Sequence, residues 1–466
     1  RRLAFDELFL LQLVFGRRRI RAEADSRAPD IEPGEIFRAA RESLPFELTG
    51  GQDKALAGIL ADLASPGRSM RLLSGDVGSG KTAVALLAAA AALDSGLQTA
   101  LVVPSLLVAR QHAELFDRFL RPQGGITALV TGDPRSASAR KLLSGNDVDV
   151  AVGTQALLSP NIEFRRLGLV IIDEQHRFGV EQRLRLPQRE GCHVLMLTAT
   201  PIPRSMALAL YGDLTLEELA GFPLKRAGSS THLRDESARE AVMDYVEERI
   251  EKGERAFVVH PRIEGDDPAS AEFGFEYLCR RFGDRAALLH GSMSGDTKAE
   301  VFGEFRRGEK PILATTSLIE VGVDVPEATV MVIESADSFG LAQLHQLRGR
   351  IGRAEKKGRC ILITGAKKGT AKWQRLAEFA QTADGLEVAK TDLLERREGE
   401  ILGLEQSGAP DLVFADPLRM PGLLEIAGEL AEELLSKDPE LQAPEHRLLR
   451  AGVRLYTTDK GSKMAV

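Results

Sequence analysis

The sequence predicts an α/β protein in which two doubly wound parallel sheets stand in tandem, followed by a helix-rich C-terminal region. First, short apolar runs alternate with helix-like stretches, and the runs contain almost no polar alternation, as in parallel strands buried on both faces. Second, this rhythm lapses into Gly, Pro and Ser at residues 221–234 and then resumes. Third, the strand rhythm is lost after residue 365.

The apolar runs give the strands that we predict for each unit. In the first unit these strands are Met70–Leu73, Thr99–Val103, Ile126–Val130, Val148–Val152, Leu167–Ile172 and Val194–Leu197. In the second unit they are Ala256–Val259, Ala286–Leu289, Pro311–Ala314, Val330–Ile333 and Cys360–Ile363. We therefore place one domain at residues 46–225 and a second at 226–365.

Both ends of the chain are predicted to be mostly helical. Residues 1–45 form a brace, with an amphipathic helix over Leu3–Phe15 and then an irregular linker, and Thr49 caps a helix over Gln52–Leu63. The C-terminal region spans residues 366–466. Its predicted helices are Thr370–Thr382, Leu386–Arg397, Gly422–Ser436 and Glu445–Ala451, with disorder over Thr457–Val466.

Composition limits the classes of function. The net charge of −7 does not indicate a protein that binds nucleic acid through bulk charge, so any such binding would need a lined groove. The cysteines Cys192, Cys279 and Cys360 lie far apart and lack metal-ligand spacing, which favours buried, reduced thiols in a cytosolic protein. We expect no membrane span, since no apolar stretch is long and charge-free enough.

Residues Gly75–Thr82 have the form of a phosphate-binding loop. Its glycines, including Gly75, Gly78 and Gly80, allow a tight turn that aims backbone N–H groups at phosphate oxygens. Lys81 would reach the β and γ phosphates, and Thr82 would offer its hydroxyl to Mg²⁺. A predicted strand precedes the loop and a helix follows it, so a chance glycine-rich turn is the weaker alternative.

Asp173 and Glu174 end a buried strand and favour hydrolysis of the bound nucleotide. We assign Asp173 to Mg²⁺ and Glu174 to the attacking water; the alternative is an acidic strand end exposed to solvent. His176 is interpreted as a hydrogen-bonding link to the next strand end, where Thr198 and Thr200 lie.

The second unit has no glycine-rich phosphate loop, so we expect ATP to lie at the interface of the two units. Arg350 and Arg353 would share one helical face, and a guanidinium delivered to the γ-phosphate contributes roughly 10³–10⁵ in rate. A set of surface arginines is the alternative. Hydroxyl groups and glycines just past predicted strands would line a groove that contacts nucleic-acid phosphates; they include Ser105, Thr154, Thr316, Ser317 and the Gly322–Asp324 segment.

These motifs together resemble superfamily 2 helicases, and more closely the RecG-type branched-DNA helicases. The resemblance rests on residues 75–82 (GDVGSGKT), 173–180 (DEQHRFGV), 198–204 (TATPIPR), 319–326 (IEVGVDVP) and 339–350 (FGLAQLHQLRGR). Gln175 separates the chain from the related transcription-repair coupling translocases. The similarity covers nearly the whole chain.

The resemblance implies two RecA-like domains with ATP and Mg²⁺ at their interface. It also implies translocation on double-stranded DNA that remodels stalled forks and Holliday junctions in recombination and repair. It assigns Gln52 to adenine, Asp324 to the nucleotide and Gln346 to the catalytic group. Residues 382–412 resemble the family's translocation motif, with Arg396 and Gln406 as coupling residues. We expect a cytoplasmic, nucleoid-associated monomer, with single-strand DNA-binding protein as a candidate partner.

Three departures from the family pattern matter. The translocation motif has Arg397-Glu398-Gly399 where the family usually has Gly-Pro-Gly after an Arg. Ser105-Leu106 stands where Thr-Glu is usual. The family's wedge domain, an oligonucleotide-binding fold, has no counterpart here, which fits either a shortened chain or a relative that lacks it. For residues 1–466 alone we expect DNA-stimulated ATP hydrolysis with weak fork unwinding.

Two other functions remain open from the sequence. An RNA helicase would be stimulated by single-stranded RNA and not by duplex DNA. A DNA-binding scaffold with an inactive ATP site is disfavoured by the full set Lys81, Thr82, Asp173, Glu174, Arg350 and Arg353.

Replacing Glu174 tests the role of the water-orienting carboxylate. Glu174→Gln is expected to lower the rate of ATP turnover by a factor on the order of 10² or more, since the amide cannot accept the proton of the attacking water. Steady-state phosphate release measures this. Unchanged turnover would show that Glu174 does not orient the water.

Overall fold

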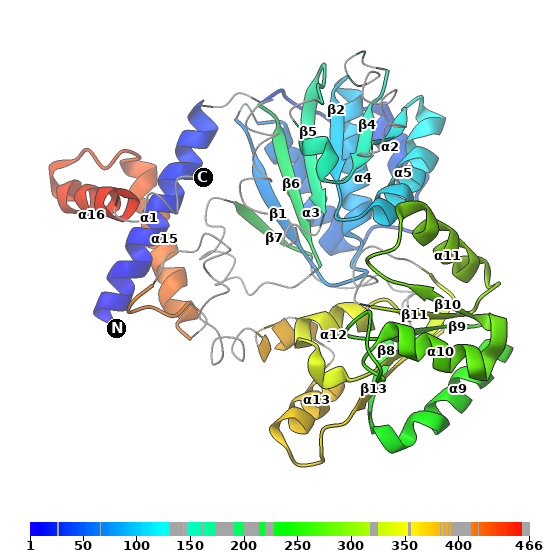
Figure 1. Cartoon of the computed structure of the whole chain (residues 1–466). Helices are drawn as coiled ribbons and strands as arrows, with labels where there is room; N and C mark the ends of the chain where they lie inside the picture. Colours follow the sequence, from blue (N-terminus) through cyan, green and yellow to red (C-terminus); the bar gives the residue numbers. More distant parts are fainter. Residues whose placement is uncertain are drawn as a thin grey trace.

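The computed structural model describes most of the chain. The described residues are 1–25, 28–65, 67–130, 143, 145, 147–159, 162–173, 191–199, 214–219, 228–316, 325–352, 356–382, 384–385, 387–389, 391–392, 412–417 and 419–458. They form three groups: an upper sheet with its helices, a lower sheet with its helices, and a helical group that joins the two chain ends (Figure 1).

The first sheet is parallel throughout and has the strand order β3-β4-β2-β5-β6-β1-β7. Its strands are β1 (Met70–Ser74), β2 (Gln98–Val102), β3 (Thr127–Val130), β4 (Val150–Gly153), β5 (Leu167–Asp173), β6 (His193–Thr198) and β7 (Thr215–Glu218). The helices of this part are α2 (Glu35–Glu42), α3 (Gly50–Leu63), α4 (Lys81–Asp94) and α5 (Leu106–Leu120), with short 3₁₀ turns η1 (Arg121–Gln123) and η3 (Gln155–Leu158).

The second sheet is also parallel, in the order β10-β11-β9-β12-β13-β8. Its strands are β8 (Ser229–Asp235), β9 (Arg255–Val259), β10 (Ala286–Leu289), β11 (Ile312–Thr315), β12 (Ala328–Ile333) and β13 (Gly358–Thr364). Its helices are α9 (Arg239–Glu251), α10 (Ala271–Phe282), α11 (Gly295–Arg307), α12 (Leu341–Arg348) and α13 (Ala371–Gln381), with η5 (Glu236–Ala238), η6 (Gly283–Arg285) and η8 (Ala336–Ser338).

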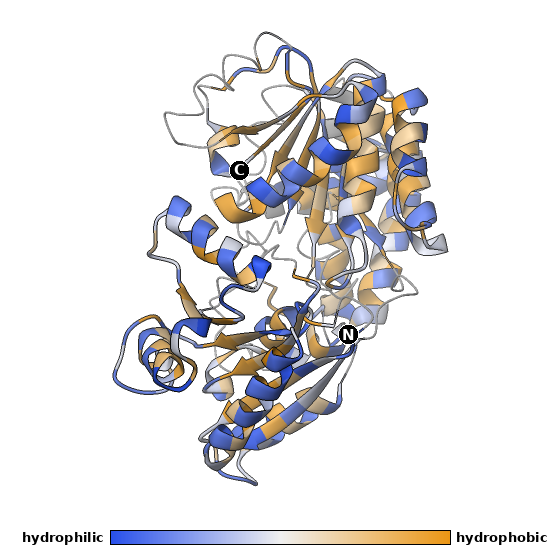
Figure 2. Ribbon diagram, turned by 90° about the vertical axis from the view of Figure 1, so that its right-hand side faces the viewer, coloured by the Kyte–Doolittle hydropathy of each residue, from blue (hydrophilic) through white to orange (hydrophobic). Residues whose placement is uncertain are grey.

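Burial on both faces explains why the strands are continuously apolar. Along β5, Leu169 and Ile171 belong to one apolar cluster, and Val170 and Ile172 belong to the cluster on the opposite face. Figure 2 shows the strands of both sheets coloured mostly as apolar residues, whereas the helices carry polar stretches. Period-two alternation is therefore absent, as expected for helix-covered parallel sheets.

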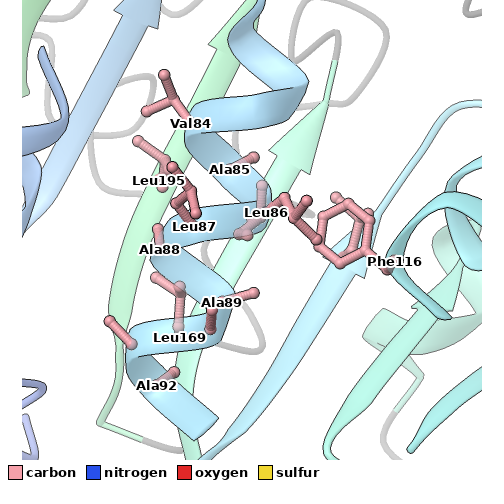
Figure 3. Close-up of a cluster of buried hydrophobic side chains, with 14 of the residues drawn as sticks. Val84, Ala85, Leu86, Leu87, Ala88, Ala89, Ala92, Phe116, Leu169 and Leu195 are labelled. Atoms are coloured by element: carbon pink, nitrogen blue, oxygen red, sulfur yellow. The ribbon is translucent and has the colours of Figure 1, made fainter. Parts of the chain in front are cut away.

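Helix α4 is buried along nearly its whole length. Its alanine-rich sequence lets it lie close to the sheet, where Leu169 and Leu195 face it and Phe116 of α5 packs beside it (Figure 3). Because α4 begins at Lys81, this packing fixes the position of the glycine-rich loop that precedes it.

The helical group unites the two ends of the chain. Helix α1 (Arg2–Asp25) packs along α15 (Pro421–Lys437) and α16 (Arg447–Thr458), which follows η10 (Pro444–His446) (Figure 1). The Glu7 carboxylate accepts hydrogen bonds from the backbone N–H groups of Val413, Phe414 and Ala415 at 2.7, 2.8 and 2.9 Å. The predicted brace therefore holds the C-terminal region.

The predicted fold class is confirmed, and the predicted strands lie within one or two residues of the observed ones. The interpretation of residues 221–234 as a break was wrong for Ser229–Arg234, which lie in β8. This polar strand is at the edge of the sheet, where it pairs only with β13 along the described chain, so it needs no apolar run.

Helix α2 forms within the stretch expected to be an irregular linker. Asp94, at the end of α4, accepts hydrogen bonds from the N–H groups of Gly34, Ile36 and Phe37 at 2.7, 2.9 and 2.9 Å. The cap thus comes from a residue distant in sequence. The side chain of Phe37 then joins the core of the first sheet.

Other expectations have mixed outcomes. Cys192 and Cys360 are buried free thiols, and burial raises the pKa of Cys360 to about 12, but Cys279 is only half-buried.

Helix α16 continues through Thr458, so the prediction of disorder was wrong at Thr457 and Thr458. Residues 459–466 and most of the predicted helix Leu386–Arg397 lie outside the described residues. Among the described helices, none is long and apolar enough to cross a membrane. The domain boundaries remain predictions.

Enlarging a side chain on α4 tests its close packing. Ala88→Leu is expected to destabilise the first sheet by about 1–3 kcal/mol, because Ala88 is fully buried. Ala61→Leu on the exposed face of α3 is the matched control and should leave stability nearly unchanged. Thermal unfolding followed by circular dichroism measures both; equal midpoints for the two variants would contradict close packing of α4.

Candidate active site

Three neighbouring strands of the first sheet bring the predicted catalytic segments together. Strands β5, β6 and β1 are adjacent and parallel, so their carboxyl ends, Asp173, Thr198 and Ser74, lie at one edge. The N–H of Gly75 donates to the carbonyl of Thr198 at 3.3 Å. This bond joins the glycine-rich loop to the end of β6.

The loop itself has the conformation that its glycines permit. Gly78 and Gly80 have φ angles of 80° and 88°, and Gly80 is the N-cap of α4. The Lys81 ammonium donates to the carbonyls of Gly75 and Asp76 at 2.7 and 2.9 Å. Lys81 is thus held inside the loop, at the helix N-terminus, where a phosphate would bind.

Gln52 fastens helix α3 to this loop. Its amide oxygen accepts from the N–H of Thr49 at 2.8 Å, and its amide nitrogen donates to the carbonyl of Ser79 at 2.8 Å. Thr49 is the N-cap, as predicted, and forms a capping box with Gln52. The adenine contact implied for Gln52 stays a prediction.

Asp173 is a largely enclosed carboxylate that faces a histidine and the charges of a lysine and an arginine. Burial raises its pKa, but His112, Lys81 and Arg350 together outweigh burial and hold the pKa below its usual value. The Nε2 atom of His112 lies 3.4 Å from an Asp173 carboxylate oxygen. Asp173 is therefore kept ionised.

An ionised carboxylate at this edge, together with the Thr82 hydroxyl in the first turn of α4, suits Mg²⁺. This ion takes one or two protein oxygens and completes its shell with phosphate and water. No group of three His, Cys, Asp or Glu side chains able to hold a metal occurs within the described parts of the chain. The fit therefore rests on Asp173 and Thr82.

Helix α12 of the second sheet reaches the glycine-rich loop. A Cβ atom at Gly349 would lie 2.7 Å from Cβ of Val77, so only glycine allows this approach. Gln346 and Arg350 are both buried here, and the Arg350 charge acts on Asp173. Helix α12 ends at Arg348, so Arg350 lies in the turn beyond it and the expectation that Arg350 shares a helical face with Arg353 was wrong. The structure still brings Arg350 together with the first sheet's site, and ATP at this interface stays a prediction.

The predicted DNA-contacting residues have different environments. Ser105 is the N-cap of α5 and accepts from the N–H of Val108 at 3.4 Å, whereas Thr154 precedes η3 and is half-buried. Thr316 is largely buried and Thr198 fully so. Because Thr198 is fully buried, it cannot contact DNA directly and can influence a DNA groove only through neighbouring residues.

Several predicted site residues lie outside the described residues. They are Glu174, His176, Thr200, Ser317, Asp324, Arg353, Arg396 and Gln406, together with the Arg397-Glu398-Gly399 departure.

Sequence reasoning assigned no role to His112, Asp76 or His345. His112 lies four residues from both Val108 and Phe116, two buried positions of α5. A histidine on the apolar face of a helix needs a polar partner, which was a usable signal. Asp76 and His345 meet across the two sheets at 2.7 Å, and nothing local in the sequence indicates that contact.

Comparison with known families gives three matches along the chain. Residues 49–208 match the DEAD/DEAH box helicase family, and residues 237–355 match the helicase conserved C-terminal domain. Residues 382–458 match the family described as ATP-dependent DNA helicase RecG, domain 3, C-terminal.

Curated relatives are similar over nearly the whole chain. The ATP-dependent DNA helicase RecG of Aquifex aeolicus is 43% identical over 95% of the chain, which spans 58% of that protein's length. That of Streptococcus pneumoniae is 39% identical over 96% of the chain, which spans 68% of its length.

Solved structures share the arrangement. A structure of RecG bound to a three-way DNA junction has a TM-score of 0.71 and 38% identity, covering 91% of this chain and 56% of that one. RNA-bound Dbp5 of S. cerevisiae, at 16% identity and a TM-score of 0.60 over 78% of this chain and 97% of that one, shows a shared fold only.

Substituting Gly80 tests the geometry of the loop. In Gly80→Ala the new Cβ would lie 2.0 Å from the Gln52 amide nitrogen, at a φ of +88°. Losing the Gln52–Ser79 bond, worth about 1 kcal/mol, together with a strain of about 1 kcal/mol, should weaken nucleotide binding about tenfold or more.

Gly124→Ala is the matched control, because Gly124 has a φ of +83° and no atom within 4 Å of the added Cβ. Both variants carry backbone strain, but only Gly80→Ala disturbs the loop. Titration with a fluorescent ADP analogue measures the affinity; equal affinities in the two variants would contradict the role of this contact.

Proposed function

The chain belongs to the RecG family of ATP-dependent DNA helicases, and from this premise we propose that it couples ATP hydrolysis to movement along branched double-stranded DNA. The remodelling of stalled forks and Holliday junctions in recombination and repair would be its task. The observation that carries the proposal is the placement of Arg350, from the second sheet, beside Asp173 at the edge of the first. Such an arrangement makes catalysis depend on how the two sheets are placed.

Each described residue of the site has a chemical task in this proposal. Lys81 would exchange the carbonyls of Gly75 and Asp76 for phosphate oxygens. Asp173 and Thr82 would hold Mg²⁺, which when bound supplies charge neutralisation of the phosphates. Arg350 would stabilise the charge that develops on the transferred γ-phosphoryl group. His112 keeps the Asp173 carboxylate in place.

The remaining predicted residues complete the proposal. Glu174 would orient the attacking water, and Arg353 and Gln346 would assist Arg350. Gln52 and Asp324 would contact the nucleotide. Ser105, Thr154, Thr316 and Ser317 would grip DNA phosphates, while His176, Thr198 and Thr200 would link that groove to the ATP site. Arg396 and Gln406 would couple domain movement to DNA.

The DNA substrate is proposed from the relatives. The solved RecG structure has a three-way DNA junction bound. A chain with a net charge of −7 would hold DNA mainly through local phosphate contacts, so binding should weaken steeply with salt and depend little on sequence. A cytoplasmic, nucleoid-associated monomer, with single-strand DNA-binding protein as a candidate partner, belongs to the same proposal.

One experiment separates a DNA translocase from an RNA helicase. ATP hydrolysis by the 466-residue chain is measured with duplex DNA, a three-way DNA junction and single-stranded RNA. We expect stimulation by both DNAs and little by RNA. Equal or greater stimulation by RNA would overturn the proposal.

Arg350→Ala tests the role of the second sheet in catalysis. The kcat for ATP with duplex DNA should fall about 10³-fold, since the stabilisation of the transferred phosphoryl group is lost. Arg280→Ala, on the exposed face of α10, is the matched control and should retain full activity. If the kcat of Arg350→Ala falls by less than tenfold, Arg350 is not a catalytic residue.

A further inference from the structure

A continuous line of hydrogen bonds runs from the phosphate-binding loop, through α12, to the end of α13. The Nε2 atom of His345 lies 2.7 Å from a carboxylate oxygen of Asp76. On the other side of the ring, Nη2 of Arg348 lies 2.8 Å from Nδ1 of His345. Nη1 of Arg348 donates to the carbonyls of Thr382 and Phe379 at 2.6 and 3.4 Å.

The partners of His345 select one tautomer of its ring. A guanidinium only donates hydrogen bonds, so Nδ1 must be the acceptor and Nε2 must carry the proton. That proton then points to the carboxylate of Asp76, which is an acceptor. The Nε2–H tautomer satisfies both partners, so the donor and the acceptor of each hydrogen bond in the line are defined.

Burial makes this line sensitive to small changes. His345 and Arg348 are only 6% exposed, and the guanidinium lies over the Phe379 ring at 4.6 Å. A buried guanidinium that loses a partner costs far more than an exposed one. Movement at Asp76 is therefore opposed unless Arg348 and the end of α13 move with it.

The line begins at a residue that the nucleotide must disturb. The Asp76 carbonyl holds the Lys81 ammonium at 2.9 Å, and its carboxylate accepts from the N–H of Val77 at 2.6 Å. If Lys81 turns to a bound phosphate, the Asp76 carbonyl loses the ammonium as a donor and keeps the N–H of Ser79, at 3.1 Å. The residue whose carbonyl changes partners is the same one whose carboxylate contacts His345.

The line ends where the predicted translocation motif begins. Thr382 follows α13 and is the first residue of the segment that matches the RecG domain 3 family. A cavity of about 420 Å³ borders this end and is lined by Asp76, His345, Arg348 and Thr382 among others.

We propose that Asp76, His345 and Arg348 are positioning residues that transmit the state of the phosphate-binding loop to the C-terminal end of α13. The inference rests on the proposed function, because what it transmits is the coupling of ATP to DNA. None of the three needs to touch DNA, and His345 and Arg348 need not touch the nucleotide.

The first test uses hydrogen exchange and requires no DNA. In the unaltered chain, ADP with Mg²⁺ should change the exchange of backbone amides at residues 376–382. His345→Phe keeps an aromatic ring, slightly larger than imidazole, but removes both hydrogen bonds, and should abolish this response while leaving nucleotide affinity nearly unchanged. A full response in His345→Phe would overturn the proposal.

The second test measures coupling to DNA. His345→Phe should retain DNA-independent ATP hydrolysis but lose about tenfold of its stimulation by a three-way junction, in the usual range of coupling between sites. His232→Phe, on edge strand β8 of the same sheet, is the matched control and should behave like the unaltered chain.

Conservative variants guard against misfolding. His345→Gln keeps a donor and an acceptor and should recover part of the stimulation, whereas Arg348→Lys keeps the charge but cannot bridge His345 and Thr382 and should not recover it. If His345→Phe fails to fold and both conservative variants behave alike, the proposal is wrong. If DNA does not stimulate even the unaltered chain, the proposed function fails, and the exchange experiment alone decides on the positioning residues.

Discussion

The common direction of the strands is the constraint on which the rest of the structure depends. Since all strand pairs within the two sheets are parallel, every strand ends at one edge of its sheet, and the functional loops gather there. The bond from Gly75 to Thr198 joins the loops of β1 and β6. Close packing of α4 then fixes where the phosphate-binding loop lies.

Electrostatics explains why the site needs residues from both sheets to keep Asp173 ionised. Asp173 is largely enclosed, and such a carboxylate stays ionised only when positive groups compensate for lost water. His112 and Lys81 come from the same sheet, but Arg350 comes from the other. The charge balance of the site therefore depends on both halves, and separating them leaves Asp173 with less compensation. The chemistry and the placement of the domains are thus linked through one carboxylate.

Features that depend on local sequence could be predicted, and those that depend on distant contacts could not. The continuous apolar runs gave the buried strands, and glycine spacing gave the loop with Lys81. Helix α2 was missed because its cap, Asp94, comes from another helix. Strand β8 was missed because a polar edge strand has no apolar signal. The contact between Asp76 and His345 joins residues 269 positions apart, which no local pattern encodes.

The predicted translocation motif, residues 382–412, lies mostly outside the described residues, but contacts hold the described residues at both of its ends. Its first residue, Thr382, is held through its carbonyl by Arg348 of α12. The residues that follow it, Val413 to Ala415, are held through their N–H groups by Glu7 of α1. One end of the motif is therefore fixed to the helix that touches the phosphate-binding loop, and the other end is fixed to the brace. Leu412 and Ala415 also pack against the apolar cluster that contains Leu8 of α1, so the brace holds this end by apolar contact as well as by hydrogen bonds.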